Sequence, residues 1–178
     1  RPPTFSQEGN PQSFQTNPQS GLPYAIGRTR MSGVRIYGET FDGGWKSEGK
    51  DDALVFGALL SAGGPIDSIE AFKADGEVVT FDPVTSYATS GNYSGQFMAM
   101  NYSLGPPSSS AIGLFFGGQN VPDWGADHKL SGIAHALWGL RFDMDGNKYG
   151  AGVPQPQWIG KWVKVYDPRL DSTYPGGS

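Results

Sequence analysis

The chain of 178 residues carries 13 Lys and Arg against 17 Asp and Glu, for a net charge of -4, and it contains no cysteine. The lack of cysteine excludes disulfides, thiolate metal sites and cysteine nucleophiles, and the mild acidity argues against a general phosphate-binding surface. With 27 glycines, 14 prolines and 37% hydrophobic residues, the composition predicts an all-β fold with little helix around one core. No apolar run approaches the roughly 20 residues of a membrane-spanning helix, so we expect no membrane segment.

The first expected strands follow a polar arm. Residues 1–20 are rich in Pro, Gln, Ser and Asn, a composition typical of linkers, and we expect an extended arm here. Residues 22–37 then alternate loosely between apolar and polar side chains, with Gly27 and Gly33 as expected bulges or bends. This pattern predicts either one bent strand or a pair of strands.

An apolar run and a hairpin come next in the chain. Residues 53–61 suit a strand or a short helix, and we favour a strand because a glycine lies inside the run and Gly-Gly-Pro ends it. Residues 66–72 and 77–81 flank the pair Asp75-Gly76, which is typical of a tight hairpin turn. The three segments together predict a three-stranded meander.

The sequence changes character between residues 82 and 129, where Ser, Gly, Asn, Tyr and Pro dominate. One strand is expected there at 96–102 and a further apolar piece at 111–116, and regular alternation returns later in the chain. We expect bent antiparallel strands in a barrel- or sandwich-like domain that carries a small inserted β subdomain. The predicted divisions are an arm at 1–20, the β domain at 21–83 and 129–178 with late strands at 132–142 and 157–166, and the insertion at 84–128.

An acidic loop and two histidines are candidates for metal or catalytic chemistry. The stretch Asp143–Asn147 has the clustered oxygens that Ca²⁺ prefers, but it lacks the remaining EF-hand spacing and a distal glutamate, and a hairpin turn explains it equally well. His128 and His135 lack the paired helical spacing of zinc hydrolases. We expect His135 to be a half-buried, hydrogen-bonded strand residue and His128 to be a loop residue.

Several carboxylates offer the pair that glycosidases use: Glu39, Asp42, Asp51, Asp52 and Asp123. Their spacing in sequence does not test the required separation of about 5–9.5 Å, and most lie in turns where a solvated role is the simpler interpretation. No Gly-x-Ser-x-Gly elbow or phosphate-cradling glycine loop is present. The sequence therefore predicts no enzyme activity, no catalytic residue, no metal ligand and no cofactor, and it leaves binding residues unassigned.

Basic and aromatic side chains suggest contacts with other molecules. Arg28, Arg30 and Arg35 form a basic cluster that would share one strand face; it suits a phosphate backbone, but a solvated face or an intersubunit ion pair is the simpler interpretation. Five aromatic residues lie in or near expected loops: Trp45, Tyr87, Tyr93, Trp124 and Trp158. Such residues stack on sugars, contact proteins or cap the ends of a small β core.

Four segments with recognisable motifs follow one another in a fixed order. Leu-Pro-Tyr-Ala-Ile-Gly-Arg-Thr-Arg-Met-Ser-Gly-Val spans 22–34, and Leu-Leu-Ser-Ala-Gly-Gly-Pro-Ile-Asp-Ser-Ile spans 59–69, followed by Ala-Asp-Gly-Glu at 74–77. The third segment, Asp-His-Lys-Leu-Ser-Gly-Ile-Ala, leads into a strand, and the fourth joins Val-Tyr-Asp-Pro-Arg to Asp-Ser-Thr. These last two segments occupy 127–134 and 165–173.

This ordered set resembles the tip attachment, or host-specificity, proteins of lambda-like long-tailed phages and the related tail hubs of prophages and gene transfer agents. The first segment is similar to the P-x-x-Y/F-G-R-x-R-x-x-G opening of their hub region, and the second is similar to their S-E-G-P-I-x-G-I … D-G meander. The sequence departs from the family at Ala62-Gly63, where an acidic residue is common, and residues 84–128 contain no motif of the family. The resemblance covers roughly residues 20–178.

The resemblance implies a structural virion component at the distal tail tip. Such a baseplate hub caps the tail tube, links it to the central fibre and assembles as a homo-oligomer, a trimer. The implied partners are distal tail and other tail tip proteins and the tape-measure protein, with indirect contact with the host cell envelope and no sequence-specific binding of nucleic acid. A carbohydrate-binding β-sandwich module and a cell-wall hydrolase-associated tail module are the alternatives.

The end of the chain bears on its completeness. The closing strand at 157–166 runs directly into Asp167-Pro168-Arg169 and a polar turn. A strand that ends in this way is normally followed by more protein. We therefore expect the chain to be an N-terminal hub-domain fragment of a longer protein.

Overall fold

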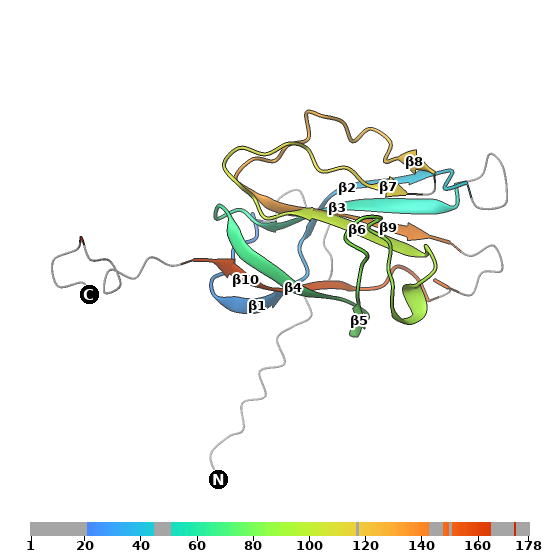
Figure 1. The fold of residues 1–178 in the computed structure, drawn as a ribbon, viewed down its shortest axis with the longest axis horizontal. Coiled ribbons are helices and arrows are strands. Elements are labelled where there is room, and N and C mark those ends of the chain that lie inside the picture. Colours follow the sequence, from blue (N-terminus) through green and yellow to red (C-terminus); the bar gives the residue numbers. More distant parts are fainter. Residues whose placement is uncertain are drawn as a thin grey trace, which may run out of the picture.

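The fold is a β-sandwich of two four-stranded antiparallel sheets, which confirms the predicted all-β class (Figure 1). The computed structural model describes residues 21–44, 51–116, 118–142, 148–149, 151–164 and 173. We call the two sheets sheet A and sheet B. Sheet A has the order β2 (Val34–Phe41), β3 (Ala53–Ser61), β9 (Ala134–Arg141), β6 (Met98–Ser103), and sheet B has the order β1 (Arg28–Met31), β10 (Pro156–Val163), β4 (Ile66–Ala74), β5 (Glu77–Val79).

Two smaller elements lie outside the sheets. The two-stranded hairpin of β7 (Phe115–Phe116) and β8 (Gln119–Asn120) lies over sheet A, on the side away from sheet B (Figure 1). A single 3-10 turn, η1 (Gly91–Tyr93), is the only helical element in the described part of the chain. No helix among these residues is long and apolar enough to cross a membrane.

The opening segment forms a pair of strands, and each strand enters a different sheet. Gly27 and Gly33, at the two expected bends, have φ of 68° and 73°. β1 pairs with β10 in sheet B, whereas β2 pairs with β3 in sheet A. The chain therefore crosses from one layer to the other within a few residues.

The predicted three-stranded meander is wrong in its pairing, although its strands and hairpin are present. β3 pairs with β2 and β9, whereas β4 pairs with β10 and β5. The Gly-Gly-Pro segment after β3 carries the chain into the other sheet, and alternation in a sequence does not reveal such a change of layer. The β4–β5 hairpin is confirmed: Asp75 and Gly76 have φ of 49° and 83°, as expected for a two-residue turn with positive φ at both positions.

The main core lies between the two sheets and is rich in aromatic side chains. Phe72 and Trp158 of sheet B have ring centroids 5.2 Å apart, and Phe72 lies 5.8 Å from Trp138 of sheet A. Trp158 is fully buried, and its indole N–H donates to Met100 Sδ over 3.1 Å. These contacts join both sheets, so packing between large aromatic rings stabilises the sandwich.

A second, smaller core lies on the outer face of sheet A. Val55 and Leu137 of that face pack with Leu114, Phe116 and Val121 of the covering segment. β3 is consequently buried on both faces, which explains why its sequence is an uninterrupted apolar run.

The segment predicted as an insertion contributes to both cores. β6 is an edge strand of sheet A and pairs with β9 from Met98 to Ser103. Tyr93 and Met98 belong to the main core, and Phe116 to the second core. The division of the chain into a hub and an insertion at 84–128 stays a prediction, but β6 belongs to the main sandwich.

Candidate functional site

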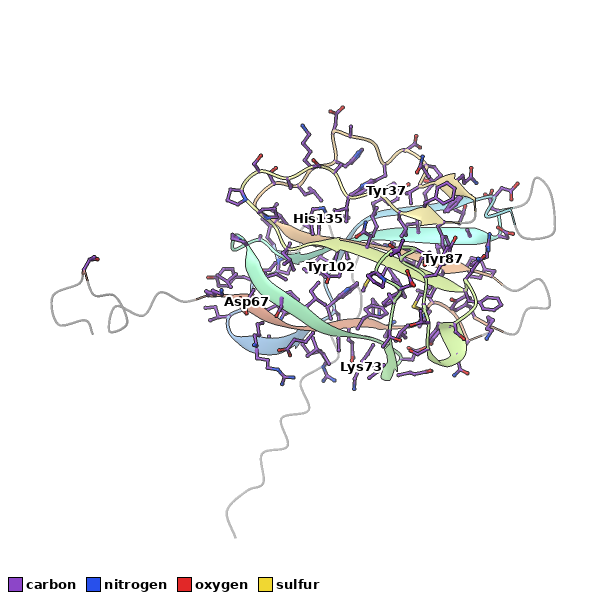
Figure 2. The ribbon with its side chains drawn as sticks, viewed as in Figure 1. Tyr37, Asp67, Lys73, Tyr87, Tyr102 and His135 are labelled. Atoms are coloured by element: carbon purple, nitrogen blue, oxygen red, sulfur yellow. The ribbon has the colours of Figure 1, made fainter. Side chains whose placement is uncertain are left out.

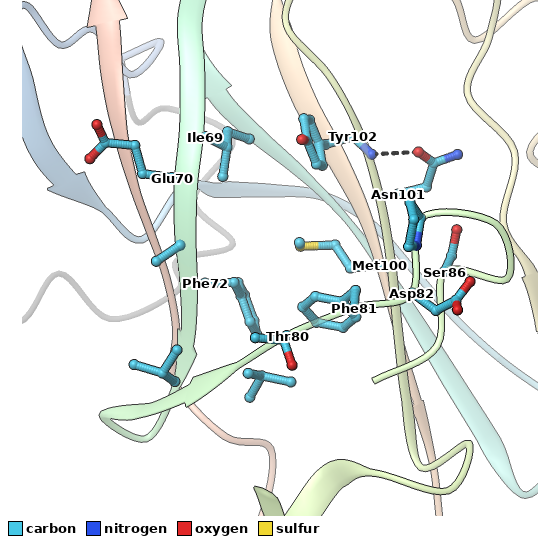
Figure 3. A pocket seen from close by; sticks show the side chains of 14 residues that line it. Ile69, Glu70, Phe72, Thr80, Phe81, Asp82, Ser86, Met100, Asn101 and Tyr102 are labelled. Carbon is cyan, nitrogen blue, oxygen red and sulfur yellow. Dashed lines mark hydrogen bonds between the residues drawn. The ribbon is translucent and has the colours of Figure 1, made fainter. Parts of the chain in front are cut away.

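A groove of about 610 Å³ opens along one side of the sandwich, between β4 of sheet B and β6 of sheet A (Figure 3). Phe72, Phe81 and Met100 line its apolar part, and the rings of Phe72 and Phe81 meet edge to face with centroids 5.6 Å apart. Tyr102 of β6 is 40% exposed at the same groove. The groove thus presents aromatic and aliphatic surface to solvent.

Both strands that flank this groove are partly paired on the groove side. β5 covers β4 only from Phe72 to Ala74, and Ile66 N donates to Leu104 O over 2.9 Å. On the opposite side, Met100 N donates to Ser86 O over 2.9 Å. Among the described residues, no strand pairs with β4 on the groove side between residues 67 and 71. This short edge is open to an extended chain.

Two polar side chains of the groove, those of Asp82 and Asn101, already make local hydrogen bonds. Asp82 Oδ1 accepts from Val84 N and Thr85 N, each over 2.8 Å, and these backbone hydrogen bonds lower the pKa of Asp82. Asn101 Oδ1 accepts from Tyr102 N over 2.8 Å, as Figure 3 shows, and Asn101 Nδ2 donates to Gly113 O over 2.7 Å. A sugar site needs such groups for its hydroxyls, so the groove is better suited to an apolar ligand segment.

One of the predicted glycosidase carboxylates, Asp52, is buried just before β3 and binds the backbone that follows β2. Asp52, expected to be solvated with the others, is 5% exposed, and its Oδ1 accepts from Gly43 N. Arg141 donates to Gly43 O and, over 3.1 Å, to Gln96 Oε1. A Cβ at Gly43 would lie 2.5 Å from Asp52 Oδ1, so the close approach requires glycine. The buried Asp52 is therefore structural.

The other predicted carboxylates lie at the surface of the same end and beside Tyr37. Asp51 Oδ2 accepts from Thr40 Oγ1 over 3.1 Å, and Asp42 Oδ1 accepts from Gly44 N over 2.8 Å. Glu39 and Asp123 are exposed and lie near Tyr37. Burial of Tyr37, reinforced by these two negative charges, raises the pKa of its phenol to about 12.

The two histidines differ in burial. His135 is fully buried, not half-buried as expected, because β9 is covered on both faces; its Nδ1–H donates to Ile133 O over 2.7 Å. Its Nε2 has no hydrogen-bond partner among the described residues. His128 is the loop residue that the sequence predicts, and its ring stacks on Trp124 with centroids 4.7 Å apart.

We expect the buried His135 to make the fold less stable in mild acid. Burial lowers the pKa of His135 below its usual 6.5, and the hydrogen bond with Ile133 opposes this only in part. The unfolded chain therefore binds a proton that the folded chain resists, so the free energy of unfolding falls as the pH drops below about 6.5. Urea denaturation at a series of pH values from 7.5 to about 5 measures the effect.

Two variants test whether His135 is the group responsible. His135→Gln should flatten the dependence of the free energy of unfolding on pH in this range, whereas His128→Gln should preserve that dependence. The carboxyls of Asp67 and Asp82, whose pKa values are lowered from 3.8, lose their contributions only at more acidic pH. Equal slopes for the two variants would show that His135 is not the group responsible.

The predicted basic cluster is divided between the two sheets. Arg28 and Arg30 lie at alternate positions of β1 and share the outer face of sheet B. Arg35 lies on β2 in sheet A, with its guanidinium 5.4 Å from the centroid of the Phe56 ring. The expected single face of three arginines is therefore wrong, because Gly33 carries the chain into the other sheet between Arg30 and Arg35.

The predicted loop aromatics form no exposed platform in the part of the chain that is described. Trp158 lies in β10 and is fully buried, and Tyr93 is 8% exposed. Trp124 and Tyr87 are half-buried in the second core, where the Trp124 indole N–H donates to Ile112 O over 2.9 Å. Trp45 lies outside the described residues. This arrangement favours the interpretation that these rings cap and fill a small β core.

The calcium candidate Asp143–Asn147 also lies outside the described residues. Within those that are described, no group of three or more His, Asp or Glu side chains is arranged to hold a metal ion. The groove residues Tyr102 and Phe81 were missed by sequence reasoning. Each lies in an ordinary strand or turn pattern, and only the approach of β4 to β6 brings them together.

No family model matches the chain, and no curated protein is found to be similar. Among solved structures, one chain of the "Virion of native gene transfer agent (GTA) particle" is similar, with a TM-score of 0.43 and 19% sequence identity. The likeness covers 92% of this chain and 34% of that chain, so this chain spans about a third of the length of its structural neighbour. At this identity and TM-score, the likeness alone does not define what this chain does.

Proposed function

We propose that the chain is a structural virion component, a hub domain of a tail tip or baseplate that caps the distal tail tube and links it to the central fibre. The proposal rests on the ordered resemblance to phage and gene transfer agent tail hubs. The observation that carries it is that the two longest matching segments, 22–34 and 59–69, pack directly on one another. Because the two segments contact one another, they form one structural unit, and we expect proteins that share this unit to share both sequence motifs.

The contacts between these two segments are specific. Ala62 N donates to Pro23 O over 2.8 Å, and the Tyr24 ring lies so close to Gly63 that a Cβ there would be 2.0 Å from Tyr24 Cε2. The first segment also binds the last strand, since Trp162 N donates to Gly27 O over 2.8 Å. The Gly-Gly-Pro sequence therefore packs on the Pro-Tyr sequence, and the close approach at Gly63 belongs to this chain, because an acidic residue is common at this place in the family.

The third matching segment borders the same sandwich. The third, 127–134, runs into β9, and Gly132 N donates to Pro106 O over 2.8 Å. The fourth directly follows β10 and, apart from residue 173, lies outside the described residues. On this proposal the role is structural and not catalytic. The partners are further copies of the chain, as a trimer, with distal tail, tail tip and tape-measure proteins, and contact with the host envelope is indirect.

Particle purification tests the proposal. The parent protein should be present in purified particles from infected or induced cells, and antibodies against the 178-residue chain should label the distal tail end in electron micrographs. Deleting this domain should leave tails without a tip. A soluble monomer that is absent from purified particles would overturn the proposal. Glycan binding by the isolated chain would favour a carbohydrate module, and clearing of peptidoglycan a cell-wall hydrolase module.

A further inference from the structure

The outer face of sheet B is basic although the chain as a whole is acidic. Met31 of β1 is paired with Trp158 of β10, and both side chains contribute to the core. Because side chains alternate between the two faces of a sheet, Arg28 and Arg30 point to the face of sheet B that lies away from the core. Arg28 and Lys161 have side chains 68% and 55% exposed. We call this surface the basic face; its cations, on the sheet or at its end, are Arg28, Arg30, Lys73, Lys161 and Lys164.

Carboxylates on the basic face neutralise only part of this charge. Glu70 is shared by Arg28, at 2.7 Å, and Lys161, at 3.9 Å, and Asp67 pairs with Lys164 at 2.7 Å. Arg30 reaches the neutral amide of Gln157, at 3.5 Å. The described part of the chain has nine basic and eleven acidic residues; five and two of them belong to this face, which leaves four basic and nine acidic residues elsewhere in that part. The charge of the described residues is therefore strongly divided.

The basic face also offers apolar surface between its charges. Ile159 and Ala71 are paired across β10 and β4, and both are half-buried. Val78 of β5, paired with Lys73, is 50% exposed. A surface with a small apolar centre and charged surroundings is typical of protein–protein contacts.

Complementary charge lies on the opposite side of the sandwich. Glu39 of β2 and Asp123 of the segment that covers sheet A are both exposed and lie near Tyr37. Figure 2 places Tyr37 beside sheet A and Lys73 at the far side of sheet B. One copy of the chain thus carries a basic surface on one layer and an acidic surface on the other.

We propose that the basic face binds the surface around Glu39 and Asp123 of a second copy of this chain, in a head-to-tail contact. The proposal builds on the hub function, because it names the contact through which copies would assemble. Different surfaces of the two partners make the contact heterologous, and repetition of such a contact closes into a ring or continues as a filament. Opposite charges of this kind also set the register of the contact and exclude the face-to-face arrangement, in which like charges would meet.

Charge reversal tests the contact in the 178-residue chain by sedimentation velocity. Arg30→Glu with Lys161→Glu makes both surfaces acidic, and Glu39→Lys with Asp123→Lys makes both surfaces basic. We expect either double variant to weaken self-association by about tenfold or more, and high salt to weaken that of the unmodified chain. Mixing the two variants should restore assembly, as should the chain that carries all four substitutions, because each contact again joins opposite charges.

Other outcomes would overturn the contact. A chain that stays monomeric at low salt, or variants that assemble as well as the unmodified chain, would exclude it, and so would failure of both the mixture and the fourfold variant to assemble. If the unmodified chain does not self-associate but sediments faster when duplex DNA is added, the ligand of the basic face is a polyanion and not a second copy of the chain. The presence of the protein in particles is measured separately, so the hub function and this contact can fail independently.

Discussion

Replacing Trp158 with alanine should lower the free energy of unfolding by about 3–5 kcal/mol. Trp158 is fully buried, its ring lies 5.2 Å from that of Phe72, and its indole N–H donates to Met100 Sδ. Truncation would leave a large cavity between the two sheets and remove contacts on both of them, and the surrounding rings could close it only in part. Since small domains are stable by only about 5–15 kcal/mol, the loss should be plain in guanidinium denaturation.

The matched control is Trp124→Ala. Trp124 is half-buried over the outer face of sheet A, where its ring meets that of Tyr37 edge to face with centroids 5.4 Å apart. Its indole hydrogen bond to Ile112 O and part of its burial would be lost, at a cost of about 1–2 kcal/mol. Equal losses for the two tryptophans would mean that the inter-sheet rings do not dominate the stability of the sandwich.

The positions of these two tryptophans show how far sequence reasoning reaches. The apolar run that ends at Gly-Gly-Pro predicts β3, alternation predicts β10, and Asp-Gly predicts the β4–β5 turn, because a half-buried strand must alternate and a tight hairpin needs positive φ. Trp158 was nevertheless expected near a loop, since Gly- and Pro-rich chain precedes it. The predicted strand at 157–166 already includes Trp158 and begins one residue after the observed start of β10, but the bounds of a strand do not say which of its faces is buried between the sheets.

Partner choice between strands was the second limit. β3 and β4 are adjacent in sequence yet lie in different sheets, so the predicted meander failed, and the same change of layer separates Arg35 from Arg28 and Arg30. Nothing in a period of two residues records which sheet a strand joins. The groove and the basic face depend on such pairings and therefore emerge only from the fold.

Replacing Gly105 with alanine should destabilise the fold by about 2–5 kcal/mol. Gly105 has φ of +77°, where an L-residue costs about 1–2 kcal/mol. A Cβ there would also lie 2.6 Å from Ala134 N and 2.7 Å from Ile133 C, both backbone atoms that cannot rotate away, and such overpacking adds about 1–3 kcal/mol. Here the chain leaves β6 against the start of β9, so the clash would force apart two neighbouring strands of sheet A.

Gly132→Ala isolates the effect of the close approach. Gly132 has the same φ of +77°, but its Cβ would meet nothing within 4 Å, and its N–H donates to Pro106 O beside Gly105. We therefore expect only the backbone cost of about 1–2 kcal/mol. The difference between the two midpoints in urea measures how tightly the covering segment is held where it leaves and rejoins sheet A. If the two alanine variants lose the same free energy of unfolding, the approach of Gly105 to β9 is looser than these distances require.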